Sequence, residues 1–126
     1  ARDPALVQLG GPSGVMTAAT DWHQPLAFDG ISPGGSVMVF DASRRHFDIA
    51  RNFTAFFQQE SCGFCTPCRA GTQVLVRDLD CAAQEKQHAD LEKLAHLINA
   101  TSHCGLGQTA GKPVLHWLQH TTGDRP

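Results

Sequence analysis

Three cysteine thiols lie within seven residues, at Cys62, Cys65 and Cys68 of the segment SCGFCTPCRAG. Two residues separate each thiol from the next. Gly63 and Pro67 lie between them and favour a turn, which argues against three buried apolar side chains on a packed face. Clustered thiolates are typical ligands of a metal centre. A centre with four ligands then needs one more from elsewhere in the chain.

The spacing of these thiols distinguishes two kinds of metal centre. Zinc sites usually take their thiols from two separated CxxC pairs, whereas here three thiols share one loop. Three corners of a [4Fe-4S] cluster can be bound from one loop and the fourth from a remote segment. We therefore expect a [4Fe-4S] cluster. The alternative is a structural zinc-binding module that interacts with partner proteins.

Two further cysteines are candidates for the fourth ligand. Cys81 lies in RDLDCAAQEK, at the end of a predicted helix, and Cys104 lies in TSHCGLGQTAG. Gly105 and Gly107 allow the backbone near Cys104 to approach a bulky inorganic group closely. We expect Cys104 to be the ligand and Cys81 to be a free thiol. A redox sensor based on Cys81 is a third possibility, but the neighbouring carboxylates disfavour a thiolate there.

A helix over residues 66–81, the second of four predicted helices, is expected to begin beside the thiols. Thr66 is expected to cap it, with Pro67 at its first position and Cys68 in its first turn. Unpaired N–H groups at such a helix end, at the positive end of its dipole, can reach cluster sulfurs and raise the reduction potential.

The seven histidines are not expected to be ligands. A Rieske centre would need two of them in place of two cysteines, so His103 is expected to support the site or lie on the surface. We expect Trp117 in the core, and solvated helix faces for His88, His96, His116 and His120.

The elements that must position these residues change character near residue 43. Before it, ALVQL and SVMVF alternate with glycine- and proline-rich turns and predict strands. This segment is too short to close a sheet with its own core, so it packs on the helices or belongs to a larger β-domain. After it, apolar residues recur at helical spacing. The predicted helices cover 43–60, 66–81 and 88–100, with a fourth beginning between 108 and 113. The first carries an apolar stripe of Phe47, Ala50, Phe53, Phe56 and Phe57.

The predicted fold is therefore mainly α, a small four-helix bundle preceded by a short β segment. We expect residues 1–42 to be a partial β-domain with a connector, and residues 43–126 to be the helical, cluster-binding domain.

Composition limits the class of protein. The chain has 126 residues, a net charge of -2 and a pI near 6.4, so no basic field would attract nucleic acid. No apolar run approaches the roughly 20 residues of a membrane span, and ARDPALVQLGG lacks the pattern of a secretory signal. Five cysteines cannot all pair internally. We expect a soluble, cytoplasmic protein without a direct membrane span.

Two motifs resemble a known family. ESCGFCTPCRAGT at 60–72 and TSHCGLGQTAGKPVL at 101–115 resemble the cluster segments of the NADH-oxidising flavoprotein subunit of respiratory complex I. They also resemble the diaphorase subunits of NAD-reducing hydrogenases and NAD-dependent formate dehydrogenases. GGSVMVF at 34–40 is a looser match. Phe64 and CGLGQTA look more like the hydrogenase and formate dehydrogenase branch.

The resemblance implies a fold and a ligand set. In that family the three close cysteines and the later one bind a [4Fe-4S] cluster in a C-terminal helical bundle, after a ubiquitin-like (β-grasp) domain and a flavin domain. By position, the ligands would be Cys62, Cys65, Cys68 and Cys104. Residues 1–42 would be the end of the β-grasp domain.

The resemblance also implies a function. The chain would transfer single electrons as part of an NAD(H)-linked oxidoreductase, and its partners would be an FMN/NADH-binding domain or subunit and other iron-sulfur subunits. GGPSG at 10–14 lacks the strand-to-helix context of a phosphate-binding loop. FMN and NAD(H) are therefore expected in the parent subunit but not bound by this chain, which would not be catalytic by itself.

Overall fold

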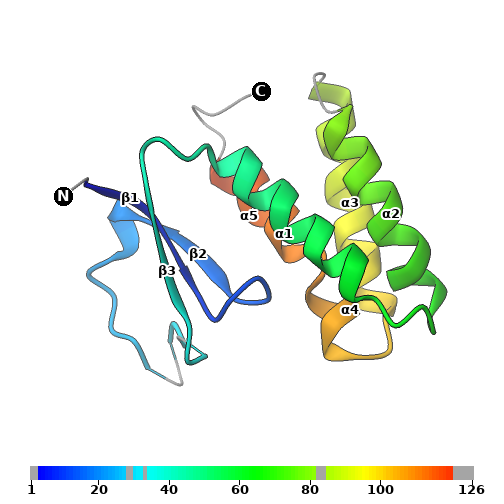
Figure 1. Cartoon of the computed structure of the whole chain (residues 1–126), viewed down its shortest axis with the longest axis horizontal. Helices are drawn as coiled ribbons and strands as arrows, with labels where there is room; N and C mark the ends of the chain where they lie inside the picture. Colours follow the sequence, from blue (N-terminus) through cyan, green and yellow to red (C-terminus); the bar gives the residue numbers. More distant parts are fainter. Residues whose placement is uncertain (1–2, 28–29, 33, 82–84, 121–126) are drawn as a thin grey trace.

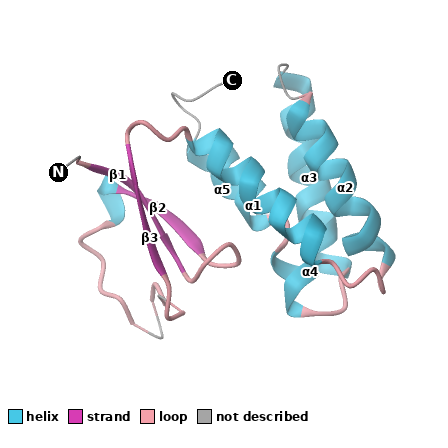
Figure 2. Cartoon of the chain, viewed as in Figure 1, coloured by secondary structure: helices cyan, strands magenta, loops and turns pink. Residues whose placement is uncertain are grey.

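The computed structural model describes residues 3–27, 30–32, 34–81 and 85–120, with the side chains of 85–87 excluded. Within these residues, three strands, five α-helices and one 3-10 turn follow one another along the chain, with the strands first (Figures 1 and 2). The architecture is thus a mixture of a small sheet and a helical part. The prediction of a mainly α fold understated the sheet.

The sheet is antiparallel, with β1 (Pro4–Leu9) between β2 (Val15–Ala18) and β3 (Val37–Asp41). Val7 pairs with Thr17 on one side and with Val39 on the other. The hairpin between β1 and β2 turns at Gly10 and Gly11, whose φ angles of 81° and 66° favour glycine. The strands at ALVQL and SVMVF are confirmed. The four-residue β2 was not predicted, because it is too short to show a clear alternation.

The sheet packs against the first helix, α1 (His46–Glu60). Met16 of β2 forms a buried cluster with Ile49 and Phe53, and Leu6, Met38 and Phe40 pack on its edge. The β segment therefore shares a buried cluster with the helical part.

The helical part contains four longer helices and one short one. These are α1, α2 (Thr66–Asp80), α3 (Glu85–Thr101), the five-residue α4 (Gly105–Thr109) and α5 (Lys112–His120). Helix α4 was not predicted, because a single turn containing two glycines carries no helical periodicity. Helix α3 also begins at Glu85 rather than at His88.

The bundle core is made by side chains from α1, α2, α3 and α5. Trp117 is fully buried, as predicted, and its ring lies edge-on to Phe47 at 5.1 Å. The predicted apolar stripe of α1 wrongly included Phe56, which is 41% exposed, whereas Phe57 is buried. The remaining fully buried core residues include Leu75, Leu79, Leu91, Ala95, Ile98 and Val114.

Two glycines set the distances between helices. A Cβ at Gly71 of α2 would meet Ile98 of α3 at 2.5 Å, and a Cβ at Gly111 would meet the Ala95 carbonyl oxygen at 2.5 Å. Both values lie well inside van der Waals contact. These positions therefore keep α2 and the start of α5 close to α3.

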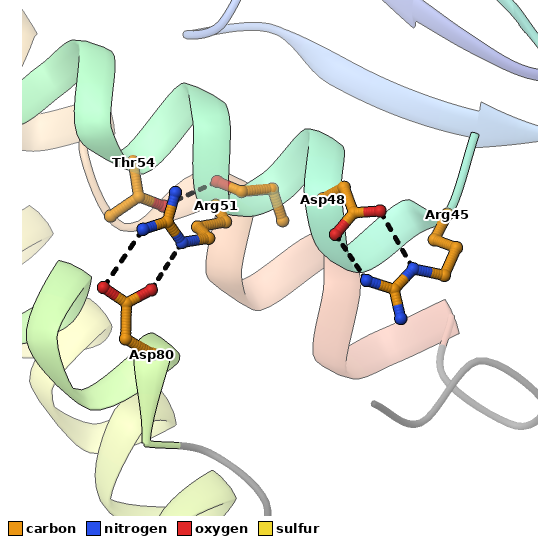
Figure 3. Close-up of polar contacts among 6 residues, drawn as sticks. Arg45, Asp48, Arg51, Thr54 and Asp80 are labelled. Carbon is orange, nitrogen blue, oxygen red and sulfur yellow. Dashed lines mark hydrogen bonds and ion pairs between the residues drawn. The ribbon is translucent and has the colours of Figure 1, made fainter.

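Two arginine–aspartate ion pairs lie at the surface of α1, and the Arg51–Asp80 pair joins α1 to α2 (Figure 3). Arg51 of α1 binds both carboxylate oxygens of Asp80 at the end of α2. Arg45 makes a similar two-bond contact with Asp48 in the first turn of α1, at 2.8 and 2.9 Å. The Arg51 pair ties the far end of α2 to α1. Among the described residues, no helix has both the length and the apolar character needed to cross a membrane.

Candidate functional site

Four cysteine thiols line one small pocket at one end of the helical part. Cys62, Cys65, Cys68 and Cys104 surround a cavity of about 80 Å³ together with Glu60, Ser61, Phe64 and Leu106. The loop after α1 and the start of α2 supply three thiols, and the residue before α4 supplies the fourth. In Figure 1 these segments meet at the end of the bundle where α4 lies.

Cys81 does not line this pocket. It directly follows the last residue of α2, while Cys68 lies in the first turn of the same helix. A rise of 1.5 Å per residue separates the two by about 20 Å. The structure therefore brings together the four thiols proposed from the sequence and leaves the fifth exposed at the opposite end of α2.

The start of α2 differs from the prediction. Cys65, not Thr66, is the N-cap residue, and no side chain makes a regular capping hydrogen bond. The backbone N–H groups of His103 and Cys68 instead lower the pKa of the Cys65 thiol. Thr66 is already inside the helix, as its first residue. The first turn of α2 thus favours a thiolate in the pocket.

The exposure of the thiols is graded. Cys68 is buried and its Sγ lies 3.3 Å from the Ser61 hydroxyl, Cys65 is half-buried, and Cys62 and Cys104 are exposed. All five cysteines are free thiols. The pocket therefore has one side within the bundle and another open to the surface.

Gly107 allows α4 to approach the thiols. A Cβ there would meet the Ser102 Cβ at 2.4 Å and the Cys68 Cβ at 3.1 Å, whereas a Cβ at Gly105 would meet nothing within 4 Å. Of these two glycines, only Gly107 has neighbouring protein atoms that a Cβ would meet. Its role is to seat α4 against Cys68 and Ser102.

The loop carrying Cys62 is held by two contacts that sequence reasoning missed. The Arg69 side chain donates from Nη1 to the Gly63 carbonyl at 3.0 Å, and the Gly63 N–H donates to Ser61 Oγ at 3.4 Å. Gly63 has a φ of 77°, in the region that favours glycine. Arg69 and Ser61 lie next to ligand candidates in the sequence, which was the available signal.

The histidines lie outside the pocket lining, and two predictions about them were wrong. His88 is half-buried, with its ring edge-on to Trp117 at 5.1 Å. His116 is also half-buried, and burial lowers the pKa of this side chain, with smaller effects of Lys112 and His120.

The other expected positions are observed. His96 and His120 are exposed, and so is His103, whose ring lies 5.8 Å from that of Phe64.

The donor set of the pocket fits a group bound by thiolates. Its four sulfur atoms are soft ligands of the kind that iron-sulfur clusters and zinc prefer. Within the described residues, no three His, Cys, Asp or Glu side chains converge to hold a single ion. Ser102 adds a hydroxyl that is only 6% exposed and has no hydrogen-bond partner in the described part of the chain. This thiol pocket thus offers four ligands, and an unused donor lies beside Cys68.

A family model matches residues 48–124, and its description is NADH-ubiquinone oxidoreductase-F iron-sulfur binding region. The match covers α1 to α5 and includes all four pocket cysteines.

Several curated proteins are similar over most of the chain. The NAD-reducing hydrogenase HoxS subunit alpha of Cupriavidus necator is 39% identical in an alignment 124 positions long that covers 94% of this chain and 21% of that protein. The NADP-reducing hydrogenase subunit HndC of Solidesulfovibrio fructosivorans is 38% identical, over 86% of this chain and 24% of the relative. A subunit of the NADH-quinone oxidoreductase of Streptomyces coelicolor is 36% identical, over 88% of this chain and 27% of the relative. The chain thus spans about a quarter of the length of these relatives.

Part of a solved structure has the same fold as this chain. An NAD+-reducing [NiFe]-hydrogenase in the H2-reduced state matches with a TM-score of 0.90 and 36% identity, over 98% of this chain and 23% of that chain. The likeness therefore includes the sheet as well as the helices.

Proposed function

Because this chain belongs to the NADH-ubiquinone oxidoreductase-F iron-sulfur binding region family, we propose that it binds one [4Fe-4S] cluster and transfers single electrons through it. The observation that carries the proposal is the thiol pocket. It joins Cys62, Cys65 and Cys68 to Cys104, which lies in a remote segment, and it excludes Cys81. We propose these four thiols as the ligands.

The residues of the chain would each have a defined task. Cys62, Cys65, Cys68 and Cys104 would hold the cluster as thiolates. The N–H groups of His103 and Cys68, which already lower the pKa of Cys65, would stabilise negative charge on that side of the pocket. Leu106 and Phe64 line the pocket and would limit access of water. When bound, the cluster supplies the one-electron redox couple.

The proposed setting is a larger NAD(H)-linked oxidoreductase, such as a complex I-type enzyme, an NAD-reducing hydrogenase or a formate dehydrogenase. The names of the relatives support the hydrogenase and complex I-type settings. FMN and NAD(H) would bind in the parent subunit, and the partners would be its FMN/NADH-binding domain and other iron-sulfur subunits. This chain would relay electrons without catalysing the reaction by itself, in the cytoplasm.

The β segment has a separate proposed origin. β3 lies at the edge of the described sheet and exposes Val37 and Val39 by 57% and 62%. Exposed apolar side chains on an edge strand commonly mark a surface that another element covers. This supports the proposal that residues 1–42 are the end of a larger β-grasp domain and that residues 43–126 form the cluster-binding domain.

A reductive titration tests the proposed function. The protein is purified anaerobically and titrated with dithionite while its visible absorption and electron paramagnetic resonance spectrum are recorded. We expect broad visible absorption that bleaches on reduction and a paramagnetic signal from a one-electron couple. A colourless protein that takes up no electrons and contains zinc would instead identify a structural zinc module.

A further inference from the structure

Ser102, two residues before the pocket residue Cys104, carries a buried hydroxyl with no hydrogen-bond partner among the described residues. The residue follows the last residue of α3 and is only 6% exposed, and its Oγ is unpartnered in the part of the chain that the structure describes. A hydroxyl removed from water without a partner costs free energy, so this arrangement calls for an explanation.

Three threonine hydroxyls on the helices are satisfied locally. Thr54 donates to the Ala50 carbonyl at 2.8 Å, Thr72 to that of Cys68 at 2.8 Å and Thr101 to that of Leu97 at 2.7 Å. Each of these bonds reaches back one helical turn. Ser102 follows α3 directly and makes no such bond, so its hydroxyl is available for another acceptor.

The backbone of Ser102 is fixed on both sides. Its N–H donates to the Ile98 carbonyl at 3.1 Å, and its own carbonyl accepts from Gln108 Nε2 at 3.2 Å. Gly107 packs against the side chain, since a Cβ there would meet Ser102 Oγ at 2.5 Å. These contacts leave the hydroxyl little freedom to reach another group.

The hydroxyl lies on the Cys68 side of the pocket. The same Cβ on Gly107 would meet the Cys68 Cβ at 3.1 Å, which places Cys68 beside Ser102. Cys68 itself lines the thiol pocket. Sulfur atoms in this part of the pocket would be the nearest unused acceptors.

We propose that Ser102 is a positioning residue whose hydroxyl donates a hydrogen bond to sulfur on the Cys68 side of the bound cluster, and thereby raises its reduction potential. This inference rests on the proposed function. Reduction adds negative charge to the sulfurs, so a donor aimed at them stabilises the reduced form more than the oxidised form.

The test compares Ser102→Ala with Thr101→Ala in the full chain. The first substitution removes only the buried hydroxyl. The second removes a neighbouring exposed hydroxyl that binds the Leu97 carbonyl. Midpoint potentials are measured by redox titration, iron and sulfide by chemical assay, and the shift of the Fe–S stretching frequencies in D2O by resonance Raman spectroscopy.

We expect Ser102→Ala to retain the iron and sulfide of the unsubstituted chain but to have a more negative potential. A three- to tenfold change in the redox equilibrium corresponds to about 28 to 59 mV for a one-electron couple. Part of the D2O shift should also disappear. Thr101→Ala should leave both quantities unchanged.

Three results would overturn the inference. If Ser102→Ala binds the cluster with an unchanged potential and D2O shift, the proposed hydrogen bond does not exist. The proposed function would then still stand. Loss of the cluster in Ser102→Ala alone would give the hydroxyl a role in assembly instead. Absence of a cluster from the unsubstituted chain would reject both the proposed function and this inference.

Discussion

Cys104 and Cys81 are both exposed free thiols, and only their positions distinguish them. Cys104 lines the thiol pocket, and Cys81 lies at the opposite end of α2. We therefore expect Cys104→Ser to lose or degrade the cluster and Cys81→Ser to keep it, as measured by iron and sulfide content. Equal loss in both variants would contradict the ligand set.

Gly107 and Gly105 offer a second matched pair. Gly107→Ala should destabilise the fold by about 1–3 kcal/mol, because overpacking forces neighbouring groups to move. The new Cβ would meet Ser102 at 2.4 Å, whereas at Gly105 it would meet nothing within 4 Å. Denaturant unfolding of both variants checks this prediction. A loss of stability in Gly105→Ala as large as that in Gly107→Ala would show that the close contact is not the cause.

At single residues, sequence reasoning succeeded where the chemistry is local. The chain has five cysteines, and two-residue spacing and nearby glycines were enough to select the four that line the pocket. It failed where a role depends on the exact start of a helix, since Cys65 takes the N-cap position expected for Thr66. Ser102 was missed because its importance comes from burial against Gly107, which no spacing rule reveals.

At the scale of elements, the Arg51–Asp80 pair is the contact that joins α1 to the end of α2 (Figure 3). Both side chains are almost half exposed, so Arg51→Ala should cost only about 0.2–1 kcal/mol. Arg77→Ala is the control, because Arg77 pairs with Asp78 on the same helix. Urea unfolding at neutral pH measures both, and a loss above that range would indicate a larger role in joining the helices.

The same pair predicts a pH dependence. The hydrogen bond from Arg51, with its charge, lowers the pKa of Asp80 below its ordinary value of 3.8. As the pH falls, the Asp80 carboxylate therefore becomes protonated in the unfolded chain before it does so in the folded chain. The contribution should be fully present above about pH 5 and be lost as the pH falls below 4 through the folded pKa. Unfolding curves between pH 5 and pH 2 should converge for Arg51→Ala and the unsubstituted chain; a constant difference would contradict this.

Helix α5 predicts a second pH effect, nearer neutrality. Burial lowers the pKa of His116 below its ordinary value of 6.5, so the unfolded chain binds more protons as the pH falls past that value. Stability should decrease from pH 7.5 towards pH 5.5, and His116→Gln should flatten this dependence. His96→Gln, at an exposed position of α3, is the control. An identical pH dependence in His116→Gln would contradict the prediction.

The elements differ in how far periodicity can predict them. α1, α2 and α3 carry apolar stripes over 15 to 17 residues and were predicted with small errors at their ends. α4 and β2, with five and four residues, are too short to show a period. Their positions depend on tertiary contacts, such as those of Gly107 and Met16.

At the scale of the whole molecule, two short motifs were enough to predict the family, which the match over 48–124 confirms. The packing of the sheet on α1 was left open, since it depends on Met16, Ile49 and Phe53 from separate segments. The thiol pocket lies at one end of the helical part, with Cys62, Phe64 and Cys104 exposed. Electrons would therefore have a short path between cluster and surface at that end.

Every role proposed for this chain depends on its holding a [4Fe-4S] cluster. The most direct measurement is the iron, acid-labile sulfide and zinc content of anaerobically purified protein. We predict about four irons and four sulfides per chain, as the composition of such a cluster requires. One zinc per chain without sulfide would show that the thiol pocket holds a different centre.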